Sequence, residues 1–248
     1  MNASRVIVIS GGTRGIGAAI ARRCAADGDR LILGYRSRRA EAEELARELR
    51  SKGAEVGLCA GDLTVPGSEL ALIEAARERF GRLDALVNNA GSTLHLGELA
   101  RTPEDIIRTV IGTNLTATVL LARAAVLAFE RQEGPGVIVN ISSTAAQTGA
   151  PGSYVHYAAA KAGVEALTVG LAAEVAGRGI RVVGVAPGTT FTDLHAEAGA
   201  PGRAEAAAAR IPFGRAGHPE EVAAAVHWLL GEEAGYTGGT IIRVAGAA

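Results

Sequence analysis

Several kinds of residue are scarce in this sequence, and each shortage excludes a class of protein. The 248 residues include two cysteines, one tryptophan and one methionine. Cys24 and Cys59 lie far apart in apolar segments, and their spacing fits neither a metal site nor a redox motif. The five histidines share no metal-ligand spacing either. We therefore expect two buried structural cysteines, no metal ion, and a reducing, cytoplasmic location.

An excess of charge of one sign is also missing. Lys and Arg total 25 and Asp and Glu total 26, so no overall basic field attracts nucleic acid or an anionic membrane surface. The longest apolar stretch, residues 118–129, contains Arg123 and is shorter than the roughly 20 residues of a membrane-spanning helix. The apolar run after Arg5 is too short for a secretory signal. We expect a soluble protein that binds neither nucleic acid nor membrane.

The sequence does contain a regular alternation of strand-like and helix-like segments. Short β-branched runs lie at residues 5–10, 30–35, 55–60, 85–88, 137–141, 180–185 and 240–244, and segments with helical spacing, such as 38–52 and 68–80, lie between them. The runs are almost wholly apolar, which is typical of strands buried on both faces of a parallel sheet. This pattern predicts one α/β domain over residues 1–248, a doubly wound (Rossmann-type) seven-stranded parallel sheet with helices on both faces.

One segment, residues 189–214, departs from this rhythm. It is rich in Ala, Gly and Pro and precedes the helix that begins at Pro219. Long connections in compact domains are often functional, so we expect a mobile substrate lid. The alternative is a surface insertion without a catalytic role.

A glycine-rich turn follows the first strand. It reads Ser10-Gly11-Gly12-Thr13-Arg14-Gly15-Ile16-Gly17 and leads into a helix that extends to about Asp27. Glycines here allow a tight turn and let the backbone approach a pyrophosphate, whose charge the amides at the helix N-terminus can meet. Glycine in a strand-to-helix turn can also be purely steric, so the turn alone does not establish a cofactor site.

The spacing Gly-x-x-x-Gly-x-Gly resembles that of the short-chain dehydrogenase/reductase family. Three further motifs appear in the family's order, at the ends of or after the fourth, fifth and sixth strands: Asn88-Asn89-Ala90-Gly91, Tyr157-Ala158-Ala159-Ala160-Lys161 and Pro187-Gly188. The match spans nearly the whole chain. The family usually has threonine at Ser10 and Gly-Gly at Gly246-Ala247, and neither departure touches the reacting groups.

The resemblance implies that the carboxyl ends of the strands bind NADP(H). The expected cofactor-binding residues are Gly11, Thr13, Arg14, Gly15, Ile16, Gly17, Arg36, Ser37, Asp62, Leu63, Asn89, Ala90, Gly91, Tyr157, Lys161, Pro187, Gly188, Thr190 and Thr192. It also implies that Asp62 contacts the adenine, although an aspartate after a strand often serves as a turn or cap residue.

The residues after the second strand predict a preference for NADP(H) over NAD(H). NAD enzymes of this architecture usually carry an acid there for the ribose hydroxyls, whereas this chain has Tyr35-Arg36-Ser37. Arg36 offers a planar set of donors to a 2′-phosphate, and Arg14 is expected to approach the same group from the other side. The alternative is that both arginines are simply solvated.

Tyr157 and Lys161 are four residues apart in a helical segment, so their side chains project from one face. A phenol has a pKa near 10, and an ammonium about 5 Å away supplies on the order of 3 kcal/mol toward its anion at an effective dielectric of 20. We therefore expect Lys161 and the positive nicotinamide of the oxidised cofactor together to lower the pKa of Tyr157. The resemblance implies that Tyr157 is the general acid/base and that Lys161 also holds the nicotinamide ribose.

Two supporting polar residues complete the expected catalytic set. The family's serine usually lies thirteen residues before the tyrosine, which points to Thr144, but Ser143 has the better position after the fifth strand and is assigned here. Asn114, in the helix before the fifth strand, matches the family asparagine that supports a water chain from the lysine. The alternative for Asn114 is an ordinary polar helix residue.

These assignments predict an NADPH-dependent carbonyl reductase, with hydride transfer to a small-molecule carbonyl and Tyr157 as proton donor. Oxidation of a sugar or another alcohol by the same residues is the alternative within enzymes. An NADP-sensing protein without turnover is the alternative from another class, and the intact pair of Tyr157 and Lys161 argues against it. Family resemblance and long Ala/Leu-rich helices at 113–129 and 156–175 also predict a homotetramer.

Overall fold

Strand formation follows the apolar runs of the sequence. The computed structural model describes residues 4–248, and its seven strands form one parallel sheet in the order β3-β2-β1-β4-β5-β6-β7. The strands are β1 Val6–Ile9, β2 Arg30–Tyr35, β3 Val56–Ala60, β4 Ala85–Asn88, β5 Gly136–Ile141, β6 Ile180–Pro187 and β7 Ile241–Val244. The predicted doubly wound sheet is confirmed, with boundaries that differ by one or two residues.

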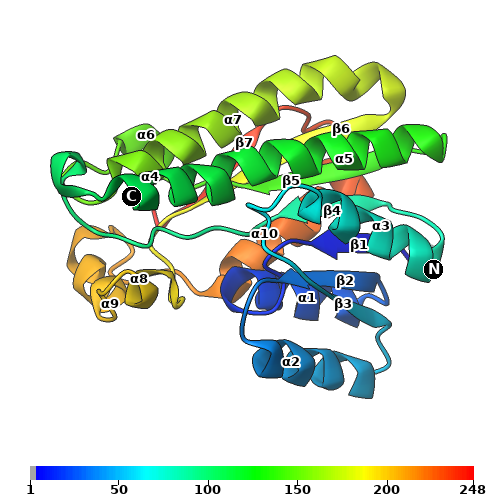
Figure 1. The fold of residues 1–248 in the computed structure, drawn as a ribbon, viewed down its shortest axis with the longest axis horizontal. Coiled ribbons are helices and arrows are strands. Elements are labelled where there is room, and N and C mark those ends of the chain that lie inside the picture. The colour runs from blue at the N-terminus through cyan, green and yellow to red at the C-terminus, as the bar shows by residue number, and fades with distance from the viewer. Residues whose placement is uncertain (1–3) are drawn as a thin grey trace.

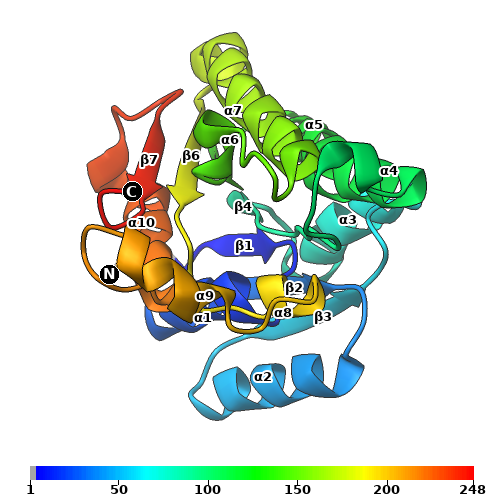
Figure 2. The same ribbon diagram turned by 90° about the vertical axis from the view of Figure 1, so that its left-hand side faces the viewer.

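Helices cover both faces of this sheet (Figures 1 and 2). Along β1, Ile7 and Ile9 pack toward one layer of helices while Val6 and Val8 pack toward the other, because successive side chains of a strand alternate between faces. The first layer contains α1 Gly15–Ala26, α2 Arg39–Ser51 and α10 Pro219–Leu230, and the second contains α3 Ser68–Phe80, α5 Ala117–Arg131 and α7 Val155–Val175. Both layers therefore bury apolar strand residues.

The end of β1 meets the end of β4 at the point where the strand order reverses. Open α/β sheets bind their ligands at this crevice. The hydroxyl of Ser10 joins the two strand ends, since it accepts hydrogen bonds from the backbone amides of Asn89 (3.0 Å) and Ala90 (3.1 Å). A serine can replace the family's usual threonine here because the hydroxyl is the group that makes both contacts.

One continuous helical stretch, Glu104–Arg131, is long and apolar enough by composition to cross a membrane, with a mean hydropathy of 1.6 over its most apolar window. This differs from the expectation based on residues 118–129, because α4 Glu104–Ile111 and the π-helical turn Gly112–Thr116 extend α5 toward its N-terminus. Half of that window is buried. Leu121, Ala125 and Phe129 pack against Leu86 of the sheet, as expected for a helix that covers a core.

Residues 189–214 form a small folded cap. They contain α8 Leu194–Glu197, α9 Arg203–Ala207 and a 3-10 turn at Ala208–Arg210, none of which was predicted. The backbone of Thr189 and Phe191 bonds to Gly217, at 2.9 Å in both cases. Buried alanines of α9 pack with Ile211 and Phe191, so short apolar contacts give this Ala- and Gly-rich segment a core of its own. The remaining helix, α6 Ala145–Thr148, is a single turn.

Candidate active site

The carboxyl ends of the strands open into one cavity of about 250 Å³ that extends from the glycine turn to Tyr157 and Lys161. Every site residue predicted from the sequence lines this cavity except Gly17 and Asn114. The sheet therefore brings together motifs that are up to 177 residues apart in the chain, from Gly11 to Gly188.

The glycine turn leaves room that any side chain would fill. A Cβ atom on Gly17 would lie 2.2 Å from the carbonyl oxygen of Gly11, so Gly17 supports the turn from behind. Gly15 adopts a positive φ of 49°, which strains residues other than glycine. Within residues 4–248 no side chain caps α1, and its first turn contains no acid. The positive end of this helix and its amides are therefore suited to an anion.

The arginine after β2 lies beside an aspartate. Nη1 of Arg36 is 3.9 Å from Oδ2 of Asp62. Asp62 also accepts hydrogen bonds from the backbone amide (2.9 Å) and the hydroxyl (2.7 Å) of Thr64, and these bonds hold the pKa of Asp62 below its usual value. Asp62 thus lines the cavity while making the turn contacts that were considered as the alternative to adenine binding.

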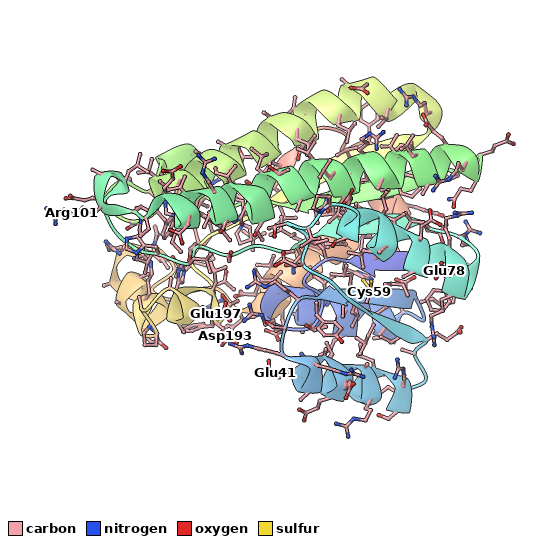
Figure 3. All side chains as sticks on the ribbon, viewed as in Figure 1. Glu41, Cys59, Glu78, Arg101, Asp193 and Glu197 are labelled. Atoms are coloured by element: carbon pink, nitrogen blue, oxygen red, sulfur yellow. The ribbon has the colours of Figure 1, made fainter. Side chains whose placement is uncertain are left out.

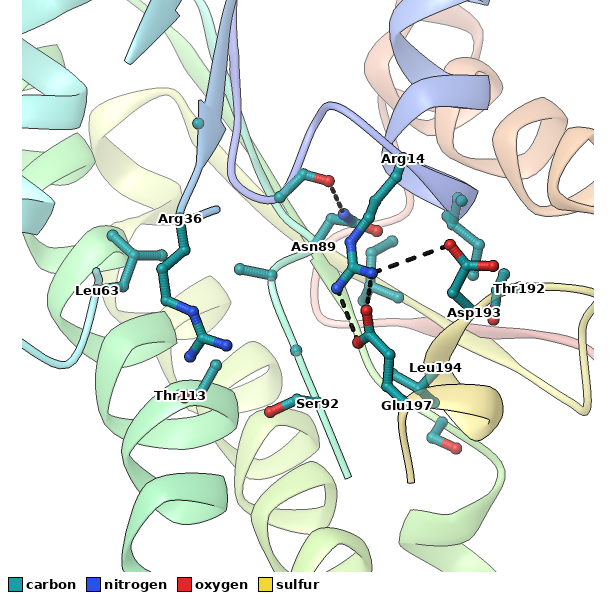
Figure 4. Close-up of a pocket in the computed structure, with 18 of the residues that line it drawn as sticks. Arg14, Arg36, Leu63, Asn89, Ser92, Thr113, Thr192, Asp193, Leu194 and Glu197 are labelled. Carbon is teal, nitrogen blue, oxygen red and sulfur yellow. Dashed lines mark hydrogen bonds and ion pairs between the residues drawn. The ribbon is translucent and has the colours of Figure 1, made fainter. Parts of the chain in front are cut away.

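Arg14 binds a carboxylate of the folded segment 189–214, called the lid from here on, instead of sharing a partner with Arg36. Its two terminal nitrogens donate to both carboxylate oxygens of Glu197, and Asp193 lies at 4.0 Å. Figure 4 shows Arg14 directed toward Glu197, with Arg36 extending from the opposite side of the view. In this arrangement Arg14 binds the carboxylate of Glu197. The structure therefore does not show Arg14 and Arg36 directed at one shared phosphate site.

Tyr157 and Lys161 lie one turn apart on α7 and are almost completely buried, with 7% and 3% of their surfaces exposed. Nζ of Lys161 is 5.7 Å from the centre of the Tyr157 ring and donates a 2.8 Å hydrogen bond to the carbonyl oxygen of Ile141. The ring of Tyr154 stands edge-on to Tyr157, with 5.3 Å between centroids. The phenol and the amine thus face the cavity from one helix.

Burial favours the uncharged form of both groups. It raises the pKa of the Tyr157 phenol above its usual value of 10, and a hydrogen bond with Ser143 only partly opposes this. It lowers the pKa of Lys161 to about 8. Loss of hydration thus sets the direction of the Tyr157 pKa shift in the protein without a cofactor. The expected lowering also requires the positive nicotinamide of the oxidised cofactor and stays a prediction for the complex. Tyr157 is protonated at neutral pH.

Ser143 is the hydroxyl residue beside the phenol. Its hydroxyl lies near enough to the Tyr157 phenol to oppose part of the rise in that group's pKa, and its oxygen accepts a hydrogen bond from the backbone amide of Ala145 at 3.2 Å. Thr144 lines the same cavity, but its amide donates to the carbonyl oxygen of Pro187 at 3.0 Å and the residue precedes α6. The geometry thus pairs Ser143 with Tyr157, while the backbone of Thr144 joins two strand ends.

Asn114 lies behind the cavity wall, in the π-helical turn rather than in a regular helix. Its amide nitrogen donates to the carbonyl oxygens of Ser92 (2.7 Å) and Val110 (2.8 Å), while its buried Oδ1 finds no partner among the described residues. A Cβ atom on Gly91 would lie 2.6 Å from that oxygen and 3.6 Å from Nζ of Lys161. Gly91 therefore keeps the space between Asn114 and Lys161 open.

Several residues that shape the site were not found from the sequence. Asp193 and Glu197 come from the lid and lie next to one another in Figure 3, and Glu197 also binds Arg38 at 2.9 Å. The basic run after β2 was a signal for Arg38, but nothing in the sequence placed the lid acids. Cys59 is only half-buried and lines the cavity, which corrects the expectation of a buried cysteine. Cys24 is buried as expected.

Two of the five histidines lie close to the tyrosines of the cavity. Nε2 of His156 lies 3.4 Å from the carbonyl oxygen of Thr93. His195 of α8 is buried, stacks on Tyr154 with 6.3 Å between ring centroids, and lines the cavity. Residues 4–248 contain no group of three or more His, Cys, Asp or Glu arranged to hold a metal ion.

The chain is similar to known oxidoreductases over its whole length. A family model described as enoyl-(acyl carrier protein) reductase matches residues 11–246. The uncharacterized oxidoreductase YgfF of Escherichia coli is 37% identical over 97% of this chain and 98% of its own length. 3beta-hydroxysteroid dehydrogenase 1 of Eggerthella lenta is 40% identical over 98% and 92%.

Solved structures agree with this similarity. A double mutant of a Serratia marcescens short-chain dehydrogenase/reductase superposes with a TM-score of 0.90 at 30% identity, covering 98% of this chain and 97% of that one.

Proposed function

Since the chain belongs to the short-chain dehydrogenase/reductase family, we propose that it interconverts a carbonyl compound and a secondary alcohol with NADP(H), chiefly as a carbonyl reductase. The observation that carries this proposal is the buried pair of Tyr157 and Lys161 with Ser143 beside them, in one cavity with the glycine turn. A nicotinamide cofactor is the family's redox partner, and the residues present fit it.

The fit rests on the shape and polarity of the cavity. Gly11 and Gly15, with the uncapped end of α1, would hold a pyrophosphate. Asn89 to Gly91 would lie beside the adenosine ribose, and Lys161 would bind the nicotinamide ribose. When bound, the cofactor supplies or accepts the hydride.

The protein's own residues handle the proton. In the reducing direction Tyr157, protonated at neutral pH, donates its proton to the substrate oxygen and becomes a phenolate. Ser143 donates a hydrogen bond to the same oxygen and stabilises its developing charge. The ammonium of Lys161 stabilises the phenolate. The unpartnered Oδ1 of Asn114 would accept a hydrogen bond from a water molecule, and that water would help to return a proton to Tyr157.

Preference for NADP(H) over NAD(H) is part of the proposal. The three residues after Gly34 include no acid, and an acid at this point would repel a 2′-phosphate. Arg36 and Ser37 line the cavity there instead. The nearest carboxylate, Asp62, is engaged by two bonds from Thr64. These features favour a bound phosphate beside Arg36.

Oxidation of an alcohol is the second candidate. The relative from Eggerthella lenta is named a hydroxysteroid dehydrogenase, and the same residues serve both directions. A non-catalytic NADP sensor is the weaker alternative, since it has no need of a buried tyrosine–lysine pair. The substrate is a small carbonyl or alcohol that fits beside Tyr154 and His195.

We also propose a homotetramer in the cytoplasm. Val119 of α5 and Val169 of α7 expose 38% and 53% of their surfaces, which favours pairing of these two helices across two-fold axes. Two unpaired cysteines suit a reducing compartment. Light scattering at micromolar concentration should give the mass of four chains, and a monomer would reject this assembly.

The test is a screen of ketones and alcohols, followed by NADPH absorbance, with the wild type and Tyr157→Phe. Loss of the proton donor should reduce turnover by roughly 100-fold or more while NADPH affinity changes less than about twofold. Tyr236→Phe is the matched control, because that ring is fully exposed. Near-wild-type turnover of Tyr157→Phe would refute the mechanism.

A further inference from the structure

The short helix α8 bridges two arginines at the edge of the cofactor cavity. Glu197 binds Arg14 through both carboxylate oxygens, and one of those oxygens also accepts a 2.9 Å bond from Nη2 of Arg38. Asp193 supports the contact at 3.6 Å from Arg38 and 4.0 Å from Arg14. Figure 4 shows these lid acids directed at Arg14. The lid is thus attached to the glycine turn by charge.

The contact of Glu197 with Arg14 and Arg38 changes the electrostatic field at the rim of the cavity, where a 2′-phosphate would bind. Arg14, Arg36 and Arg38 bring three positive charges to the rim, while Asp193 and Glu197 bring two negative ones from the lid. Asp62 and Glu41 add two more, beside Arg36 and Arg38. With α8 and Asp193 in place, four carboxylates face three arginines, and with both displaced the three arginines face two carboxylates.

The same helix reaches the substrate end. Two residues before Glu197, His195 stacks on Tyr154, which contacts Tyr157. The hydroxyl of Thr93 lies 3.5 Å from the carbonyl oxygen of Leu194. A movement of α8 therefore changes the contacts of Glu197 with the arginines and of His195 with the substrate wall together.

From these contacts we propose that Glu197 determines cofactor specificity by competing with a 2′-phosphate for Arg14 and Arg38. The inference rests on the proposed binding of NADP(H). A carboxylate and a phosphate each present paired oxygens to a guanidinium group, so the two anions use the same donors. A cofactor without the 2′-phosphate leaves Glu197 in place, whereas a phosphorylated one displaces it and loosens α8.

The opposite role is also testable. If Glu197 held Arg14 in the orientation that a phosphate needs, its loss would weaken phosphate binding. Competition predicts tighter binding, because a negative charge is removed and two guanidinium groups are released. The sign of the change thus separates the two roles.

The probes are adenosine 2′,5′-bisphosphate and adenosine 5′-phosphate, titrated by calorimetry into the wild type and Glu197→Gln at one fixed salt concentration. We expect the bisphosphate to bind the variant about tenfold more tightly, the scale of one charge-assisted hydrogen bond, and the monophosphate to change less than about twofold. Glu205→Gln is the control, since Glu205 lies on α9 and forms no ion pair with any described residue. Unchanged or weaker binding of the bisphosphate would overturn the proposal.

Hydrogen exchange without any ligand supplies an independent readout. Amides of residues 193–207 should exchange faster in Glu197→Gln than in the wild type or Glu205→Gln, because the lid loses its attachment. Equal exchange would overturn the attachment itself. The proposed NADP(H) preference has a test of its own, and it fails if the wild type binds NADH as tightly as NADPH. Even then, the bisphosphate affinities of Glu197→Gln and the wild type can still be compared.

Discussion

Nζ of Lys161 lies 5.7 Å from the centre of the Tyr157 ring, yet its other close contact is the carbonyl oxygen of Ile141, not a carboxylate. Burial therefore acts on both groups with little compensation. It raises the pKa of the phenol and lowers the pKa of the amine to about 8. At neutral pH the site holds a protonated phenol beside an ammonium, which is the state needed to reduce a carbonyl.

The pH dependence should differ between the two directions. Reduction should be nearly constant from pH 6 to 7.5 and fall above about pH 8, as Lys161 loses the charge that stabilises the phenolate. Oxidation needs the phenol to lose its proton and should rise with pH. Initial rates in both directions between pH 6 and 10 measure this. Reduction that accelerates above pH 8 would contradict the assigned protonation states.

Lys161→Met should abolish turnover but stabilise the fold. The pKa of Lys161 is about 8 in the folded protein against 10.5 unfolded, so the unfolded state binds more protons and the stability of the wild type rises with pH between these values. Below pH 8 the buried charge costs folding on the order of 3 kcal/mol, at about 1.36 kcal/mol per pKa unit.

Part of that cost is offset by the hydrogen bond to Ile141, which the methionine loses. We expect the Tm at pH 7 to rise by a few degrees, at roughly 2–4 °C per kcal/mol for a chain of this size. Thermal unfolding of Lys161→Met and of Lys52→Met, whose side chain is exposed, measures the difference. A lower Tm for Lys161→Met than for the control would show that the buried charge of Lys161 does not destabilise the fold.

Ser143→Ala should impair catalysis far more than Thr144→Val. Ser143 lies near the Tyr157 phenol and acts on its pKa, whereas Thr144 contributes a backbone amide to Pro187 that valine retains. Removing one donor to a developing oxyanion typically lowers kcat by roughly 100-fold or more, and Thr144→Val should stay within a few-fold of wild type. Steady-state kinetics on one substrate decide between them. A larger loss of activity in Thr144→Val than in Ser143→Ala would assign the substrate-orienting hydroxyl to Thr144 instead.

Arg36→Asp should remove the preference for NADPH. Because Glu197 occupies Arg14 in this structure, Arg36 is the arginine at the cavity without a lid partner. Loss of one charge-assisted contact should weaken NADPH binding by about one to two orders of magnitude and leave NADH nearly unchanged. Fluorescence titration of both cofactors measures this, with Arg39→Asp on the exposed face of α2 as control. An unchanged ratio of dissociation constants would refute the role of Arg36.

Local patterns in the sequence were sufficient where one element decides the outcome. The apolar runs predicted all seven strands, and the four-residue spacing of Tyr157 and Lys161 predicted their common helical face. Motifs that follow strands could be assigned to one edge because parallel strands all end there. Strand position favoured Ser143 over Thr144 as the substrate-orienting hydroxyl, and this choice stays a prediction, since both residues line the cavity.

Properties that depend on distant partners could not be predicted in this way. The pKa of Tyr157 depends on how completely neighbouring segments exclude water, and the sequence argument counted only the positive charges of Lys161 and of the oxidised nicotinamide. The π-helical turn at Asn114 depends on its bonds to Ser92 and Val110. Cys59 lies in an apolar run like Cys24, but only its position near the sheet edge brings it to the cavity.

By itself, the sequence determined the parallel sheet, the family and the residues that meet at the carboxyl ends of the strands, because periodicity and short motifs act within single elements. Only the tertiary structure decided which charges face one another. Arg14 and Glu197 are 183 residues apart, and their contact arises because a folded lid returns across the glycine turn. No local pattern specifies that return, since it depends on small apolar contacts between α9 and its neighbours Phe191, Ile211 and Ala216.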